Sequence, residues 1–253
     1  IAPGTYQGGL HFNGLHGEEG KPIILAAADK ENPPVLKGRN SCIHLTDPAY
    51  VELHNLVLTE ATSNGINIDD GGSYDSPAHH VVLRGLTIRD VGPNGNCDGI
   101  KLSGLDKFRV EDCMIERWGD GGSAIDMVGC HDGEVTGCTF RYVVRILQES
   151  RGNQFVPRRN GVFSNNIIAF RSDETRAIAN IGPGTGPDTF KFAGNHWYCI
   201  DRPERSDRFS LPVKETGGSY GADPQFVDAE SGDLRLRAIG PVRNAGARVD
   251  DSR

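Results

Sequence analysis

Short apolar runs with polar residues at alternate positions recur along the middle of the chain. One set consists of tetrapeptides that open with Asn, Gly or Asp, and their starts at residues 55, 85, 112, 137 and 165 are 30, 27, 25 and 28 residues apart. A second short alternating run precedes each tetrapeptide, and a third follows it. Three short strands in each period are typical of one coil of a three-sheet solenoid, so we predict an all-β fold.

Alternation also predicts which side chains enter the core. In each run the outer residues point inward and the middle residue points to solvent, and stacked coils repeat at about 4.8 Å, so equivalent residues form columns. The inward column of the tetrapeptides is predicted to contain Leu56, Leu86, Cys113, Cys138, Asn166 and Asn195. We expect the two cysteines to be small core residues and the two asparagines to form a hydrogen-bonded amide ladder.

Two terminal segments resemble those of known β-helix proteins. Residues 1–6 and 21–25 resemble the first coils of the alginate lyase and chondroitinase B group, and residues 222–228 with 232–236 resemble the closing segment of secreted β-helix proteins. Together with the repeat, they make the chain similar to the pectate-lyase-like superfamily, which includes polysaccharide lyases, hydrolases and epimerases. The resemblance implies a single-stranded right-handed parallel β-helix.

We expect one domain over residues 1–253, with N-terminal coils over about 1–50, core coils over about 51–200 and a closing segment over about 201–253.

The third run of each period carries the candidate site. These runs are Ile66–Ile68, Ile100–Leu102, Ile125–Met127, Val144–Ile146 and, less regularly, Ile178–Ile181. Their middle residues predict an outward column of Asn67, Lys101, Asp126 and Arg145, with Lys101 roughly 5 Å from Asp126 and roughly 10 Å from Arg145. The segments 90–99 and 117–124, which precede two of these runs, are rich in Gly and Asp, as functional loops often are.

The spacing is irregular after residue 140, where only three residues separate Phe140 from Val144. Either this turn is tight, or Val144–Ile146 belongs to a different coil and Arg145 leaves the column.

The outward column has the chemistry of uronate β-elimination. That reaction needs a cation beside the carboxylate, a base for the adjacent C–H and a donor for the leaving oxygen. Residues 98–104 resemble the lysine-bearing coil of calcium-dependent pectate lyases, which implies Lys101 as the base and Arg145 as a carboxylate or leaving-group partner. Further candidate substrate contacts are Asn67, Arg117 and Trp118.

The same resemblance implies a calcium site formed by Asp98, Asp120 and Asp126, although the adjacent aspartate pair of that family is absent here. The role of Lys101 as a base depends on the binding of calcium by these aspartates. At an effective dielectric of about 20, Asp126 at 5 Å favours the Lys101 ammonium by roughly 3 kcal/mol. Bound calcium would cancel that negative charge and repel the ammonium, which would make Lys101 a usable base.

Three other interpretations remain open. The column can be an ion-pair ladder of the kind expected on a solvated surface. The pair Asp69 and Asp70 can be the acid and base of a glycoside hydrolase of the polygalacturonase type, which for inversion lie roughly 6.5 to 9.5 Å apart. The chain can also be a non-catalytic carbohydrate-binding or structural β-helix.

Composition narrows the class of partner. The net charge of −7 and the lack of a Lys/Arg-rich block argue against nucleic acid and anionic membranes. No run of 18 apolar residues occurs, and from its opening residues we expect no signal peptide in this sequence. We therefore expect an acidic polysaccharide as partner, no insertion into a membrane, and a secreted or periplasmic location, whereas the oligomeric state, the polymer and its linkage stay open.

The six cysteines contain no CxxC pair, so most are expected to be buried core residues.

Overall fold

Three parallel sheets form the body of the molecule. The computed structural model describes residues 1–73, 75–92, 94–141, 144–146, 159–173, 179–181, 186–229, 231 and 233–242, with the backbone alone for residues 141, 144–146 and 179–181. Among these residues the helical elements are two 3₁₀ turns, η1 (Pro187–Thr189) and η2 (Pro203–Arg205). The described part is thus almost entirely β.

Each sheet takes one strand from each coil. Sheet A contains, in spatial order, β1 (Thr5–Gln7), β4 (Val35–Lys37), β7 (Val57–Thr59), β10 (Thr87–Arg89), β14 (Met114–Glu116), β17 (Thr139–Arg141), β20 (Ile167–Phe170), β23 (His196–Cys199) and β24 (Ser219–Tyr220). Sheet B contains β2 (Leu10–Asn13), β5 (Ser41–Thr46), β8 (Asn64–Asp69), β11 (Ile100–Ser103), β15 (Ile125–Val128), β18 (Val144–Ile146) and β21 (Ala179–Ile181). Sheet C contains β3 (Ile23–Ala26), β6 (Ala49–His54), β9 (Ala78–Arg84), β13 (Arg109–Glu111), β16 (Glu134–Thr136), β19 (Val162–Ser164) and β22 (Lys191–Ala193), and β12 (Leu105–Asp106) pairs with β9.

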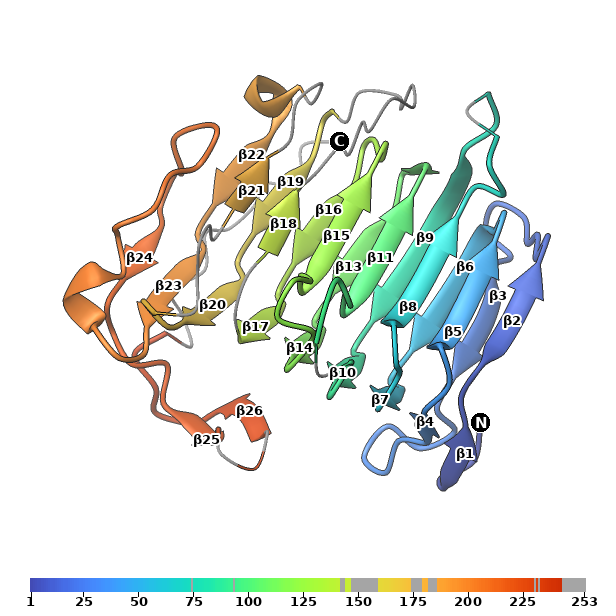
Figure 1. The fold of residues 1–253 in the computed structure, drawn as a ribbon, viewed down its shortest axis with the longest axis horizontal. Helices are drawn as coiled ribbons and strands as arrows, with labels where there is room; N and C mark the ends of the chain where they lie inside the picture. Colours follow the sequence, from blue (N-terminus) through green and yellow to red (C-terminus); the bar gives the residue numbers. More distant parts are fainter. Residues whose placement is uncertain are drawn as a thin grey trace.

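The chain visits the sheets in the fixed order A, B, C, and neighbouring strands within each sheet are parallel. Figure 1 shows the strands stacked side by side in chain order along the long axis of the molecule. This arrangement is a parallel β-helix, which confirms the predicted solenoid. In the closing segment, β25 (Phe226–Asp228) and β26 (Asp233–Leu236) form a short antiparallel pair.

The corner between sheets C and A explains why the tetrapeptides open with Asn, Gly or Asp. The backbone turns there through one residue with a positive φ. These corner residues are Asn55 (φ 54°), Gly85 (φ 63°), Asp112 (φ 52°), Gly137 (φ 67°), Asn165 (φ 56°) and Gly194 (φ 64°). Only Gly, Asn and Asp adopt this conformation at little cost. The Gly, Asn or Asp that recurs in the sequence therefore marks a recurring turn.

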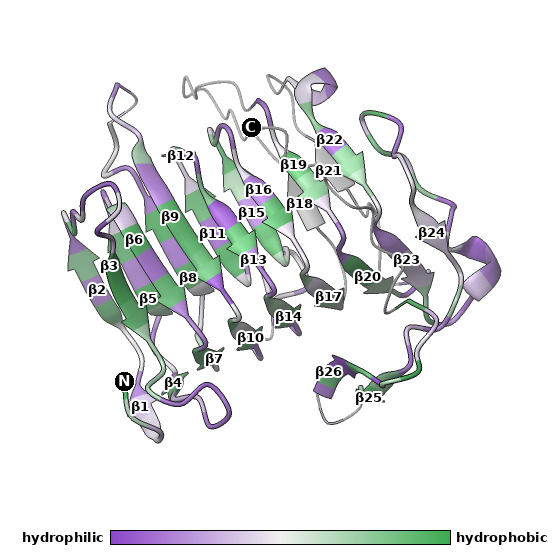
Figure 2. Ribbon diagram, turned by 180° about the vertical axis from the view of Figure 1, so that it is seen from behind, coloured by the Kyte–Doolittle hydropathy of each residue, from purple (hydrophilic) through white to green (hydrophobic). Residues whose placement is uncertain are grey.

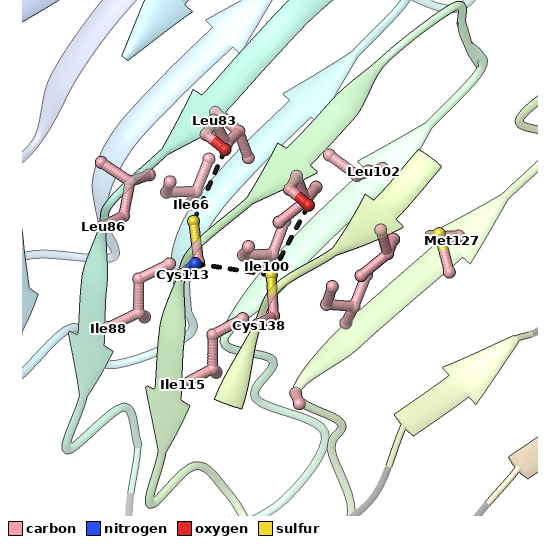
Figure 3. Packing of buried hydrophobic residues seen from close by; sticks show 14 of the residues in the cluster. Ile66, Leu83, Leu86, Ile88, Ile100, Leu102, Cys113, Ile115, Met127 and Cys138 are labelled. Atoms are coloured by element: carbon pink, nitrogen blue, oxygen red, sulfur yellow. Dashed lines mark hydrogen bonds between the residues drawn. The ribbon is translucent and has the colours of Figure 1, made fainter. Parts of the chain in front are cut away.

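Inward side chains fill the space between the sheets. Leu86, Cys113 and Cys138 are each at most 2% exposed, and the Cys113 N–H donates to Cys138 Sγ at 3.4 Å (Figure 3). The pairing of Thr87 with Val57 and with Met114 places the residues before them, Leu56 among them, in one inward column. Figure 2 shows the corresponding alternation of polar and apolar bands across the strands. The predicted core column is therefore confirmed.

The amide ladder is also confirmed. Asn166 Nδ2 donates to Asn195 Oδ1 at 3.0 Å, and Asn166 Oδ1 accepts the Cys138 N–H at 2.9 Å. Asn195 Nδ2 donates to the Phe163 carbonyl at 3.0 Å. Both side chains are at most 1% exposed, so the ladder satisfies polar groups inside an otherwise apolar column.

All six cysteines are free thiols, and five of them are buried, as expected for core residues. In the described part of the chain, no helix has the length and apolar character needed to cross a membrane.

Candidate functional site on sheet B

The residues of the predicted outward column lie on β8, β11, β15 and β18, which are neighbouring strands of sheet B (Figure 1). Asn67 pairs with Lys101, Lys101 with Asp126, and Asp126 with Arg145. β17 and β18 pair with β14 and β15, the consecutive strands of the preceding coil, so the alternative that Val144–Ile146 belongs to a different coil is wrong. The side chain of Arg145 lies outside the described residues, so its role stays a prediction.

Lys101 and Asp126 are in direct contact, because Lys101 Nζ donates to Asp126 Oδ2. The solvent exposure of these two side chains is lower than predicted for an exposed ladder. The Asp126 side chain is only 1% exposed and that of Lys101 20% exposed. All four residues of β15 are buried, so this strand is covered on its outward side as well as its inward side. The prediction of an outward, solvated side chain is therefore wrong for Asp126, whereas Lys101 stays partly exposed, and the contact is a partly buried ion pair.

Burial changes what the Lys101–Asp126 pair can do. A buried carboxylate is costly unless a cation or several donors stabilise it, and Lys101 Nζ is the donor that contacts Asp126 Oδ2. Oδ1 of Asp126 is buried and has no hydrogen-bond partner among the described residues. The arrangement presents one fixed ammonium group on the face of sheet B, suited to an anionic ligand.

The three predicted calcium ligands have separate environments. Asp98 is 1% exposed and its Oδ1 accepts the Ser123 N–H at 2.7 Å. Asp120 is exposed, and its Oδ1 accepts the Gly95 N–H at 2.6 Å. Asp126 already binds an ammonium group. Among the described residues, no three His, Cys, Asp or Glu side chains are grouped so that they could hold a metal ion. The structure does not bring these three carboxylates together, so calcium binding stays a prediction, and no step of the proposed chemistry passes through it.

Arg117 and Trp118 lie at the corner that follows β14, between sheets A and B. Arg117 makes a two-point contact with Asp90, with Nε–Oδ1 at 2.5 Å and Nη2–Oδ2 at 3.1 Å. That hydrogen bond lowers the pKa of Asp90. Trp118 is partly buried and packs against the core. A guanidinium bound in this way and a ring in contact with the core have structural roles here, so their predicted contacts with substrate remain untested.

The N-terminal coils extend the outward column by two histidines that the sequence reasoning missed. His11 pairs with His44, and His44 pairs with Asn67. The two imidazole rings are stacked, with centroids 4.3 Å apart and planes 7° apart. A signal was available in the sequence, because Ile43-His44-Leu45 has the same alternation as Ile100-Lys101-Leu102. The continuous column thus runs from His11 to Arg145.

Asp69 and Asp70, the candidate hydrolase pair, lie at the end of β8. Asp69 Oδ2 is 2.6 Å from His44 Nε2 and accepts the Asn67 Nδ2–H at 3.0 Å. Asp70 Oδ1 accepts the Gly72 N–H at 2.8 Å, and burial raises the pKa of Asp70. Asp69 therefore belongs to the polar network of sheet B, whereas Asp70 contributes to the turn that follows the strand.

A hollow of about 740 Å³ lies near one edge of this face, where the chain passes from sheet B to sheet C. Its lining includes Tyr50 and His80, whose rings are stacked with centroids 4.4 Å apart, and the exposed Lys107. Burial of its imidazole lowers the pKa of His80.

Comparison with known proteins found no matching family model and no matching curated protein. Solved structures similar to this chain include an alginate lyase from Paenibacillus sp. str. FPU-7, with 17% identity, coverage of 78% of this chain and 80% of that chain, and a TM-score of 0.49. The pectate lyase Pel9A has 13% identity, coverage of 98% and 82%, and a TM-score of 0.45. A mannuronic acid specific family 6 polysaccharide lyase from human gut microbiota has 14% identity, coverage of 85% and 84%, and a TM-score of 0.30.

Proposed function

We propose that the outward face of sheet B binds a uronate-containing polysaccharide and cleaves it by β-elimination. The observation that carries this proposal is the column in which Asn67, the Lys101–Asp126 ion pair and the backbone of Arg145 follow one another in register. An extended acidic polymer that lies along the coil axis would meet these groups in succession.

Lys101 supplies the positive charge that the reaction needs. Its ammonium group, held in place by Asp126, would bind the uronate carboxylate and acidify the adjacent C–H. Asn67 lies one strand away and offers an amide to a sugar hydroxyl. Arg145 remains the proposed partner of the carboxylate or the leaving oxygen.

A glycoside hydrolase built on Asp69 and Asp70 is the second candidate, because the raised pKa of Asp70 suits a general acid. A non-catalytic carbohydrate-binding β-helix is the third. The products separate these functions. β-Elimination creates an unsaturated uronate that absorbs in the ultraviolet, hydrolysis creates a reducing end without that absorbance, and a binding protein releases neither.

The test is a screen of pectate, alginate and chondroitin with the whole chain, read by ultraviolet absorbance and by a reducing-end assay. We expect both signals to rise together on at least one polymer. New reducing ends without absorbance would establish the hydrolase, and no product on any uronate polymer would refute the proposal.

Calcium is tested in the same screen. Each polymer is assayed in chelator and again after calcium is restored. A rate that is lost in chelator and recovered with calcium would support the predicted dependence. A rate that chelator leaves unchanged would remove calcium from the account.

A further inference from the structure

An imidazole is held on the same face as Lys101, two strands toward the N-terminus. His44 Nε2 lies 2.6 Å from Asp69 Oδ2, and Asp69 also accepts the hydrogen bond from Asn67. We infer that His44 is the catalytic base that removes the C5 proton of a bound uronate, with Asp69 as its positioning residue. This inference rests on the proposed function and deepens it.

The contacts of His44 favour one tautomer. Because Nε2 faces a carboxylate, it carries the proton, and the lone pair is left on Nδ1. Among the described residues, Nδ1 has no hydrogen-bond partner. The ring is fixed by its stack on His11 and by Thr46 Oγ1, 3.2 Å from Nε2, yet the side chain stays 33% exposed. The imidazole is thus rigid, correctly protonated and open to a ligand.

Lys101 is poorly suited to the same task. An ammonium group has no lone pair, and Lys101 Nζ already donates to the buried carboxylate of Asp126. A neutral imidazole has a lone pair that can accept a proton. The face therefore separates the two roles, with the cation at Lys101 and the base at His44.

The spacing leaves room for a sugar ring between these two groups. His44 and Lys101 are both paired with Asn67, which places their backbones two strand spacings, or roughly 10 Å, apart. A uronate over Asn67 can direct its carboxylate toward Lys101 and its C5–H toward His44, with each contact taking up roughly 3 Å of the gap.

The elimination that follows is balanced. His44 Nδ1 takes the C5 proton, the C–H electron pair forms the C4–C5 double bond, and the C4–O4 bond breaks with its electrons on O4. The leaving oxygen takes a proton from water, and the imidazolium returns its proton to solvent. No oxidant or reductant is needed.

The test compares His44→Ala and His44→Gln with His16→Ala on the polymer that the wild type cleaves. His16 is a matched control, because its Nε2 is 3.2 Å from Asp47 Oδ2 but it lies outside this column. Both His44 variants should lose at least about a hundredfold in rate, whereas the His16 variant should keep it. Free imidazole should restore part of the rate to His44→Ala, because the missing base is supplied from solution.

Asp69→Asn is the second variant. It keeps the size of the side chain but no longer favours the proton on Nε2, so kcat should fall with KM nearly unchanged, and imidazole should not restore it. Wild-type rates in both His44 variants, together with loss of rate in a Lys101 variant, would overturn this inference and leave the proposed function standing. A wild type that forms no unsaturated product would overturn both.

Discussion

The Lys101–Asp126 ion pair shows how burial changes the meaning of a residue. On an exposed ladder, loss of Lys101 would hardly affect stability. Here the Asp126 side chain is 1% exposed, so removing the cation leaves a buried carboxylate without its partner. The pair is therefore both a candidate functional group and a stabilising element.

We predict that Lys101→Ala lowers the free energy of unfolding by about 3 kcal/mol, at the low end for a broken buried pair because Lys101 itself keeps some exposure. The double variant Lys101→Ala/Asp126→Asn removes both charges and should recover most of that loss. Urea unfolding of the wild type, the two single variants and the double variant gives the coupling energy. Losses that simply add would show that the two groups do not interact.

His196 provides a pH-dependent test of the structure away from the site. Its Nε2 donates to the Ala222 carbonyl at 2.7 Å, its Nδ1 accepts from Ser219 Oγ at 2.8 Å, and burial lowers its pKa. Below the unfolded pKa of about 6.5, the unfolded chain binds a proton that the folded chain resists. Stability from this group is thus complete above that pH and falls as the pH is lowered.

We therefore expect the wild type to lose more unfolding free energy than His196→Asn between pH 7.5 and pH 5. The other titrating groups are common to both proteins, so the difference in slope reports His196. Chemical denaturation at several pH values measures it. Parallel curves for the two proteins would contradict a buried neutral imidazole at this position.

Within the inward column of sheet A, the asparagine ladder stabilises the stacked strands through side-chain hydrogen bonds to the backbone. Replacing Asn166 with Leu keeps the volume but leaves the Cys138 N–H and the Val135 carbonyl without their partners. Each buried polar group that loses its hydrogen bond lowers the free energy of unfolding by roughly 1–3 kcal/mol. Asn165→Gly is the matched control, because its φ of 56° suits glycine. Urea midpoints should fall clearly for Asn166→Leu and little for the control, and equal losses would refute the ladder's role.

The strands were predictable because their physical cause is local. Alternation within a run determines which residues point inward. The corner at Asn55 or Gly85 requires a residue type that tolerates a positive φ. The register of Lys101 with Asp126 followed from the same repeat.

The burial of Asp126 was not predictable, because it depends on what covers the outward side of β15 rather than on alternation within the strand. The separation of Asp98, Asp120 and Asp126 was not predictable either, because Asp98 and Asp120 accept hydrogen bonds from backbone N–H groups in loops that the repeat does not specify, whereas Asp126 binds Lys101. His44 was missed for a different reason. Its alternating run lies at residues 43–45, before the first of the recurring tetrapeptides at residue 55, so the repeat that predicted Lys101 does not include it.

The solenoid as a whole has three outward faces, one on each sheet, and the middle residues of their strands differ. Sheet A shows Val57, Thr87, Met114 and Thr139, and sheet C shows Glu52, Val82, Arg109 and Glu134. Sheet B carries the histidines, the amide and the buried ion pair in one column. A polymer binds along a line, so a column parallel to the axis is the natural place for its recognition.

The most direct measurement is the initial rate of ultraviolet-absorbing product on the cleaved uronate polymer, compared between two charge-neutral double variants. Lys101→Ala/Asp126→Asn removes the ion pair on sheet B. Arg84→Ala/Glu111→Gln removes an ion pair on the outward face of sheet C, where Arg84 Nε lies 2.7 Å from Glu111 Oε2. If the face of sheet B cleaves the polymer, the first variant loses at least about a hundredfold in rate and the second changes little. A folded sheet B variant that keeps the wild-type rate would contradict a catalytic role for this face.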